Sequence, residues 1–245
     1  MLENYKTHVK ERLEQGIPPL PLNAEQVTEL VELLKSPPSG DEEYILDLIT
    51  NRTPAGVDPA AYVKAAFLTA VAKGETTSPL IDKKHATKLL GTMLGGYNVE
   101  SLIGLLEDPE VGSLAADGLS HTLLMFNAKH DVIELAETNE NAKRVVDSWS
   151  NGEWFTTKPE LPEVIKAIVF RVEGEINTDD LSPAPDAPSR PDIPLHALAM
   201  LKKTMDDPIG TIEKLKESGL PVVFVGDVVG TGSSRKSATN SLLWH

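Results

Sequence analysis

Cysteine is absent from this sequence of 245 residues. That absence excludes disulfides, thiolate catalysis and any cysteine-ligated zinc or iron–sulfur site among these residues. The six histidines are scattered without the HxH or HExxH spacing of metal sites, so we expect no metal ligand among them. The sequence by itself therefore predicts no metal site.

Long apolar runs and an excess of basic residues are also missing. No run of about 18 or more uncharged apolar residues occurs, and residues 1–6 have neither the basic region nor the apolar stretch of a secretory signal. We therefore expect a soluble, cytoplasmic protein that makes no membrane contact. The net charge of −14 repels phosphate backbones, which disfavours a general nucleic-acid binder, although a small basic cluster could still act locally.

The length and composition indicate two domains. With 40% hydrophobic residues, the chain is long enough to give each of two ordinary domains its own core. We expect an α-helical domain over residues 1–155, a linker over 156–162 marked by prolines, and a mixed α/β domain over 163–245. The two predicted domains differ in their sequence patterns.

Helix signals follow one another through the first domain. In residues 24–35, Asn23 and Gln26 have the spacing of a capping box. The apolar residues of this segment recur at i, i+3, i+4 and i+7: Val27, Leu30, Val31 and Leu34. Further helices are predicted at 41–51, from Pro59 onward, and at 83–93, 99–106, 114–126 and 131–149.

About eight such helices with short links are typical of stacked helical pairs of the HEAT or armadillo kind. No repeat period is evident in the sequence, so a compact helical bundle remains the alternative.

The second domain mixes strand and helix signals. A β-branched, alternating segment at 164–173 predicts a strand, and a short apolar run at 221–225 predicts a second. A proline-rich loop over 181–194 separates the first strand from helices expected at 195–205 and 212–218. The order strand, helix, helix, strand, glycine loop, helix favours a small α/β domain.

The strongest local signal is the segment 222–240, in which a buried strand runs into a glycine-bearing loop. A helix is expected to begin at Ser233 or Ser234, where unpaired N–H groups and the helix dipole favour an anion. The hydroxyls of both serines and the guanidinium of Arg235 add donors suited to a carboxylate or phosphate. The alternative is a serine-capped glycine loop with a solvent-facing arginine.

Two phosphate-binding motifs each fail in this loop at one residue. Arg235 occupies the position of the final glycine of a Walker A loop and of the third glycine of a dinucleotide loop. An arginine there favours presentation of a charge to a small acid. A nucleotide-binding protein is therefore a disfavoured third interpretation.

A second candidate site follows the first predicted strand, in the segments 177–186 and 189–196. Asp179 and Asp180 lie in a proline-stiffened loop, where a carboxylate can orient an arginine or take a proton. They could equally be turn and cap residues, and taken alone the segment favours that interpretation.

Together, the two motifs resemble the swivel domain of bacterial aconitases of the B type. The Gly-Ser-Ser-Arg turn at 232–235 and the Thr-Asp loop at 178–179 are similar to the wider aconitase superfamily, and the continuation 236–240 is similar to the B type. The resemblance covers the whole chain, because that family also begins with a HEAT-like domain. It implies a multidomain fold: an all-α HEAT-like repeat domain followed by an α/β swivel domain.

The resemblance implies the chemistry of an aconitate hydratase, a hydro-lyase of the tricarboxylic acid cycle. Such enzymes interconvert citrate, cis-aconitate and isocitrate, and also hydrate 2-methyl-cis-aconitate to 2-methylisocitrate, on a 4Fe-4S cluster that acts as a Lewis acid. Ser233 matches the serine that abstracts the carbon-bound proton, and Asp179 matches the active-site acid. Ser234, Arg235 and Arg190 would hold the carboxylates of the tricarboxylate substrate.

Three cluster cysteines, and the domains that bear them, are missing from the sequence. The last residues, 241–245, lie inside an apolar helical pattern with no stop signal. We therefore expect a fragment that is inactive alone and needs the rest of an aconitase chain as its partner. The rival function is an interaction module, because HEAT-type stacks present extended surfaces. The resemblance implies a homodimer through the N-terminal domain and possible mRNA recognition by the apo form.

Overall fold

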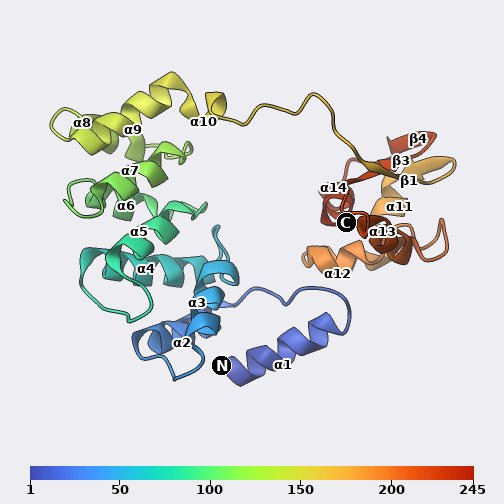
Figure 1. Ribbon diagram of the computed structural model, residues 1–245, viewed down its shortest axis with the longest axis horizontal. Coiled ribbons are helices and arrows are strands. Elements are labelled where there is room, and N and C mark those ends of the chain that lie inside the picture. Colours follow the sequence, from blue (N-terminus) through green and yellow to red (C-terminus); the bar gives the residue numbers. More distant parts are fainter. The chain divides into compact units, whose positions relative to one another are not determined.

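The computed structural model describes residues 1–245, which form two compact units. The first unit comprises Met1–Tyr5 and Leu20–Pro159, and the second comprises Lys6–Pro19 and Glu160–His245. Figure 1 labels the helices and strands along the chain, beginning with helix α1 (Leu2–Leu13). The first residues of α1 belong to one unit and its remainder to the other. None of the helices combines the length and apolar character that crossing a bilayer requires.

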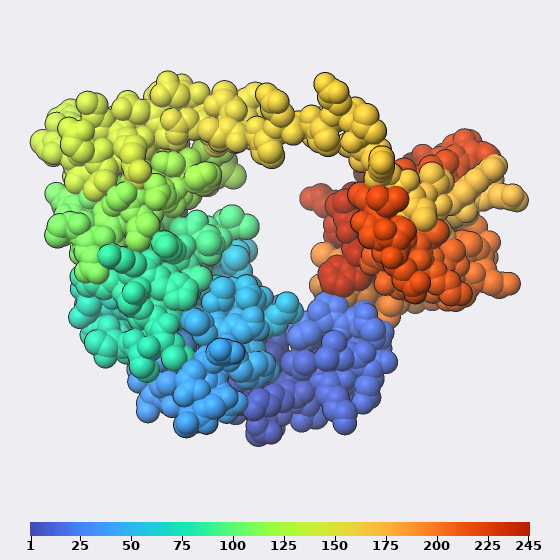
Figure 2. Space-filling view, viewed as in Figure 1, coloured from blue at the N-terminus to red at the C-terminus, as the bar shows by residue number.

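The first unit contains helices and no strand. After α1 its helices are α2 (Ala24–Lys35), α3 (Glu42–Asn51), α4 (Pro59–Lys73), α5 (Lys83–Gly91), α6 (Val99–Leu105), α7 (Gly112–Ser120), α8 (Ala128–Leu135), α9 (Glu140–Asn151) and α10 (Glu153–Thr156). Each of them packs mainly on its near neighbours along the chain: α2 contacts α3 and α4, α5 contacts α4 and α7, and α9 contacts α7 and α8. Figure 2 shows the same succession from blue through green to yellow.

Local capping explains why the best-predicted helices begin where they do. The predicted helix over 24–35 is confirmed, and both hydrogen bonds of its capping box are present at 2.9 Å between Asn23 and Gln26. Asp58 caps α4 by accepting from the N–H of Ala60 at 2.8 Å, with Pro59 at the first helical position. At the other end, Gly74 adopts the left-handed conformation that terminates a helix, with φ of 77°.

Two helix predictions in this unit were too long. The segment predicted as helix over 114–126 leaves the helix after Ser120, and Phe126 has a left-handed φ of 49°. The segment predicted over 131–149 is two helices, because Asn139 accepts a hydrogen bond from the N–H of Ala142 at 2.9 Å and so begins α9 anew. An asparagine side chain that bonds to the backbone competes with helix continuation, and an apolar pattern does not record that competition.

The second unit is built on two pairs of parallel strands. Strand β1 (Ile168–Arg171) pairs with β3 (Val222–Val225), and β2 (Glu175–Asn177) pairs with β4 (Val228–Thr231). Besides the part of α1 from Lys6 onward, the remaining elements are α11 (Thr178–Leu181), a 3-10 turn η1 (Ala184–Ser189), α12 (Ile193–Ala197), α13 (Pro208–Lys216) and α14 (Lys236–Trp244).

One face of the β1–β3 pair lies over the core of this unit. Phe170 and Phe224 are direct partners in the register, and their rings meet edge to face with centroids 5.4 Å apart. The buried residues of this core are Phe170, Val172, Ile176, Leu181, Met200, Leu201, Ile212 and Ala238. Residues from α11, α14 and the α12–α13 connection thus share one core with the strands, which holds the ends of β2 and β4 close to these helices.

The strand predicted over 164–173 is shorter than expected and spans Ile168–Arg171. The helix predicted over 195–205 is also shorter, because α12 ends at Ala197 and Leu201 turns into the left-handed region with φ of 59°. The N–H of Leu201 donates instead to the carbonyl of Asp180 at 2.8 Å, a long-range contact that sequence periodicity cannot predict. The helix expected at 212–218 is α13, which begins earlier, at Pro208, because Asp207 caps it.

The predicted glycine loop contains the strand β4, and the following helix begins at Lys236 rather than at Ser233 or Ser234. Gly232 has a φ of 88° and Arg235 is extended, with φ of −135° and ψ of 119°. The backbone therefore cannot become helical until after Arg235. A Cβ at Gly232 would lie 3.1 Å from the Thr178 hydroxyl oxygen, so glycine there also permits a close approach to α11.

Candidate functional site

The site is organised around the turn at which β2 ends and α11 begins. Asn177 caps α11, accepting from the N–H groups of Asp179 and Asp180 at 2.8 and 3.1 Å. Asp180 completes the capping box by accepting from the N–H of Asn177 at 2.9 Å, and its other oxygen accepts from the hydroxyl of Thr204 at 3.0 Å. Asp180 is therefore occupied by backbone capping and packing.

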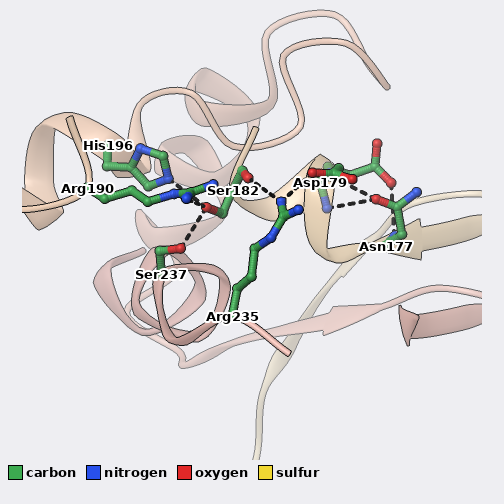
Figure 3. A network of polar contacts seen from close by, with 8 residues as sticks. Asn177, Asp179, Ser182, Arg190, His196, Arg235 and Ser237 are labelled. Atoms are coloured by element: carbon green, nitrogen blue, oxygen red, sulfur yellow. Dashed lines mark hydrogen bonds and ion pairs between the residues drawn. The ribbon is translucent and has the colours of Figure 1, made fainter. Parts of the chain in front are cut away.

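Asp179, its neighbour, points away from the cap and forms an ion pair with Arg235 (Figure 3). Arg235 also donates to the carbonyl oxygen of Ser182 at 3.2 Å. The guanidinium is thus held from two sides, by a carboxylate on α11 and by the backbone just after that helix. Arg235 comes from the β4–α14 connection, so this contact joins the two motifs singled out in the sequence.

Ser182 lies at the centre of the network and is fully buried. Its hydroxyl oxygen lies 2.8 Å from Nε2 of His196, 2.7 Å from the hydroxyl of Ser237 and 3.3 Å from Nε of Arg190. Figure 3 shows Arg190, His196 and Ser237 converging on this hydroxyl. Ser182 therefore touches Arg190 through its side chain and Arg235 through its backbone.

His196 is buried within the same network and bonded at both ring nitrogens. Its Nδ1 lies 2.8 Å from the hydroxyl of Ser189. Burial lowers the pKa of His196, and the positive charges of Arg190 and Lys202 lower it further, against the opposing effect of Asp186. The ring is therefore neutral at neutral pH.

A buried ion pair anchors the segment that carries Arg190. Arg12 donates to both carboxylate oxygens of Asp192, at 2.6 and 2.9 Å, within the second unit. Asp192 also caps α12 by accepting from the N–H of Leu195 at 3.3 Å. Although burial raises the pKa of Asp192, the hydrogen bonds from Arg12 and Leu195 outweigh that effect and leave this pKa below its usual value.

Of the residues predicted to form the site, Asp179, Arg190 and Arg235 are brought together through Ser182. Ser233 and Ser234 lie exposed in the β4–α14 connection, ahead of the helix that they were expected to begin.

The sequence predicted no role for the hydroxyls of Ser182 and Ser237 or for the ring of His196, of which Ser182 and His196 are buried and Ser237 is half-buried. These residues come from three separate segments, and no spacing in the sequence connects them.

The residues present do not fit the 4Fe-4S cluster that the resemblance implies. The chain has no cysteine, and no group of three or more histidine, aspartate or glutamate side chains is arranged to hold a metal ion. The chemistry available here is therefore that of hydroxyl, carboxylate and guanidinium groups.

The chain is thus a helical unit followed by a mixed α/β unit with a serine-centred arginine network. A family model described as the aconitate B N-terminal domain matches residues 4–155, and one described as the aconitate hydratase 2 N-terminus matches residues 167–245. The chain belongs to the aconitate hydratase B family.

Curated relatives match along the whole chain. Aconitate hydratase B of Pseudomonas aeruginosa is 63% identical over 100% of this chain and 29% of its own length. The Escherichia coli protein of the same name is 58% identical, with 30% of its length covered, and that of Helicobacter pylori is 51% identical, with 29% covered. The chain therefore spans less than a third of the length of these relatives.

Proposed function

We propose that this chain is the N-terminal part of an aconitate hydratase and supplies its proton-abstracting serine and substrate-carboxylate groups. In this proposal Ser233 takes the carbon-bound proton, and Arg190, Ser234 and Arg235 hold substrate carboxylates. Asp179 orients Arg235. The substrates are citrate, isocitrate and, as a finer proposal from the resemblance, 2-methylisocitrate.

The observation that carries this proposal is the attachment of two guanidinium groups, Arg190 and Arg235, to one residue, Ser182. Two fixed guanidinium groups in a chain with a net charge of −14 make a local cationic site in an acidic protein. Guanidinium groups present paired N–H donors that match the two oxygens of a carboxylate. A di- or tricarboxylate is the small anion that suits such a pair.

The Asp179–Arg235 ion pair supports the same function. The side chain of Asp179 is 61% exposed. An ion pair so exposed to water contributes little free energy to stability, so an incoming carboxylate can share the guanidinium of Arg235 at small cost. The pairing keeps Arg235 oriented before the ligand arrives.

A serine hydroxyl is a very weak base, so the proposed role of Ser233 requires a strongly electropositive surrounding. Arg235 follows two residues later, and the positive end of the α14 helix dipole lies just beyond it, at Lys236. These groups favour an alkoxide near the start of α14. The ligands of the iron–sulfur cluster would lie outside these 245 residues, which contain no cysteine, and we expect the chain alone to be inactive.

The same proposal includes the type of each domain and the domain boundaries. Contacts between near neighbours along the chain favour a HEAT-like stack for residues 1–155, and the α/β residues 163–245 would form an aconitase-type swivel domain after a linker at 156–162. The cytoplasmic location stays a prediction.

A second candidate function, protein interaction or dimerisation through the helical unit, is favoured by an exposed apolar surface near its last helices. Leu124 and Phe126 are each 81% exposed, and Phe155 is 62% exposed. A neighbouring hollow of about 270 Å³ is lined by Leu123, Met125, Lys129, Trp149 and Trp154. Recognition of mRNA has no comparable support and stays a prediction from the resemblance.

Titration of citrate into the 245-residue chain, followed by NMR, tests the proposed carboxylate site. We expect binding in the millimolar range, weakened roughly tenfold by Arg235→Ala, because a charge-assisted contact worth about 1.4 kcal/mol is lost. Arg171→Ala is the matched control, since Arg171 is an exposed arginine on β1 of the same unit. An equal loss of affinity in both variants, or none in either, would contradict the proposal.

A further inference from the structure

The hydrogen-bond directions around Ser182 can be worked out from the valence of each group. A serine hydroxyl has one proton to donate and can accept two hydrogen bonds. Nε of Arg190 can only donate, so it takes one of the two acceptor positions at 3.3 Å. One acceptor position and the proton are left for the two remaining neighbours, His196 and Ser237.

The hydrogen bond at Nδ1 of His196 determines which neighbour receives the proton of Ser182. The hydroxyl of Ser189 donates to the carbonyl of Asp186 at 2.7 Å, because a carbonyl can only accept. Ser189 therefore has no proton left for the ring, and Nδ1 of His196, 2.8 Å away, must carry the hydrogen. In the opposite tautomer, lone pairs of Nδ1 and of the Ser189 oxygen would face each other.

With Nδ1 protonated, Nε2 of the neutral ring is an acceptor and takes the proton of Ser182. Ser237 must then donate to Ser182 at 2.7 Å, which fills its second acceptor position. Each hydroxyl and ring nitrogen from Ser237 to Ser189 thereby has a hydrogen-bond partner, with all the bonds running in one consistent direction. Such a network, centred on the buried Ser182 and His196, holds its members in place.

We infer that Ser182 is a positioning residue for the carboxylate-binding site, holding Arg190 with its hydroxyl and Arg235 with its carbonyl, and that the Nδ1–H tautomer of His196 fixes the hydroxyl. This inference rests on the proposed function, in which both arginines bind substrate carboxylates. Ser182 itself contacts no ligand, because its side chain is fully buried and has partners at all its hydrogen-bonding positions. Its effect on binding must pass through the arginines.

The charged groups around His196 agree with a neutral ring. Arg190 and Lys202 place positive charge near it, while the carboxylate of Asp186 is paired with Lys202 at 2.5 Å. A proton on His196, which is itself buried, would add a positive charge beside those of Arg190 and Lys202.

A double-mutant cycle with citrate as the probe tests whether Ser182 acts through Arg190. We expect Ser182→Ala to weaken citrate binding by about fivefold in the unmodified chain, and by less than twofold in the Arg190→Ala background, because the residue it positions is already gone. A general loss of structure would lower affinity by the same factor in both backgrounds. That additive result would overturn the inference.

Ser241→Ala is the matched control, because Ser241 is a buried serine of α14 whose hydroxyl donates only to the carbonyl of Ser237 at 3.0 Å. We expect it to leave citrate affinity within twofold. If Arg190→Ala and Arg235→Ala both leave citrate binding unchanged, the proposed function itself fails. If they weaken it and Ser182→Ala does not, only the positioning role fails.

Long-range ¹H–¹⁵N NMR of the imidazole rings in the unmodified chain tests the tautomer without any substitution. We expect Nδ1 of His196 to carry the proton and Nε2 to be unprotonated at neutral pH, with assignment by comparison with the spectrum of His196→Gln. A protonated Nε2 on a neutral ring would overturn the hydrogen-bond directions assigned to Ser182 and Ser237.

Discussion

Asp179 and Asp180 are neighbours in the chain, yet they have unrelated partners. The carboxylate of Asp180 accepts from the N–H of Asn177, whereas that of Asp179 faces Arg235. Successive residues of a helical turn point in directions about 100° apart, so adjacent identical side chains can cap a helix and orient an arginine. The sequence left two roles open for these acids, orienting an arginine and capping a helix. Asp179 has the first role and Asp180 has the second.

Lys64 is a second residue whose surroundings change its properties, because burial shifts its pKa. It lies in α4 with only 2% of its surface exposed, and its ammonium donates to the carbonyl of Thr50 at 3.3 Å. Burial lowers the pKa of Lys64 from 10.5 to about 8. Between these two values the unfolded chain binds more protons than the folded one, so the free energy of unfolding rises with pH in that interval.

Replacing this lysine by an apolar residue should therefore stabilise the fold at neutral pH. We expect Lys64→Met to raise the free energy of unfolding by about 1–3 kcal/mol at pH 7, and to remove the part of its rise between about pH 8 and 10.5 that Lys64 supplies. Urea unfolding at pH 7 and pH 10 measures both effects. Lys73→Met, at an exposed position of the same helix, should change neither. A Lys64→Met variant that is less stable at pH 7 would refute this account.

At the scale of elements, the close crossing of α5 and α7 depends on two glycines. A Cβ on Gly118 would lie 2.9 Å from the Cα of Gly91 and 3.3 Å from Leu102, and a Cβ on Gly91 would lie 3.1 Å from the Cα of Gly118. The two backbones meet directly, so neither helix has space for a methyl group. In the sequence these glycines indicate only a low helix propensity within otherwise helical segments.

Alanine at this crossing should destabilise the protein although alanine favours helix formation. We expect Gly118→Ala to lower the free energy of unfolding by about 1–3 kcal/mol, because the added methyl forces the helices apart. Gly104→Ala is the matched control: Gly104 lies in α6 with nothing within 4 Å of an added Cβ, and a gain of up to about 1 kcal/mol is expected. Thermal or urea unfolding distinguishes them, and a stabilising Gly118→Ala would show that the helices do not pack this closely.

At the scale of the whole molecule, the connection between the two family-model matches is a continuous exposed stretch of chain. Residues 157–166 belong to no helix or strand, and all their side chains are exposed. The boundary between the two compact units, at Pro159 and Glu160, falls inside this stretch. Exposed backbone without regular hydrogen bonds is the preferred substrate of proteases.

Limited trypsin digestion should therefore cut first after Lys166. Lys158 is protected from trypsin because Pro159 follows it, which leaves Lys166 as the tryptic site of the stretch. Mass spectrometry of the early products should give fragments 1–166 and 167–245, and Lys166→Gln should delay their appearance at least tenfold. First cleavage within a helix of either unit, for example after Lys73, would contradict this expectation.

Local information in the sequence determined the class of each unit, the best-capped helices and three of the residues that meet at the site. The helix over 24–35 was predictable because both its cap, Asn23 with Gln26, and its apolar face lie within a few residues of one another. Asp179, Arg190 and Arg235 could be predicted as site residues because they lie in motifs that resemble an aconitase. The absence of cysteine was also sufficient to exclude a cluster ligand among these residues.

Only the tertiary structure decided how those residues are joined. The end of α12, where Leu201 donates to the carbonyl of Asp180, and the convergence on Ser182 depend on contacts between residues far apart in the chain. The distance from Ser182 to Ser237 along the sequence is 55 residues, and nothing local to either one indicates that their hydroxyls lie 2.7 Å apart. Long-range hydrogen bonds form when the core brings distant segments together, so a pattern of neighbours cannot encode them.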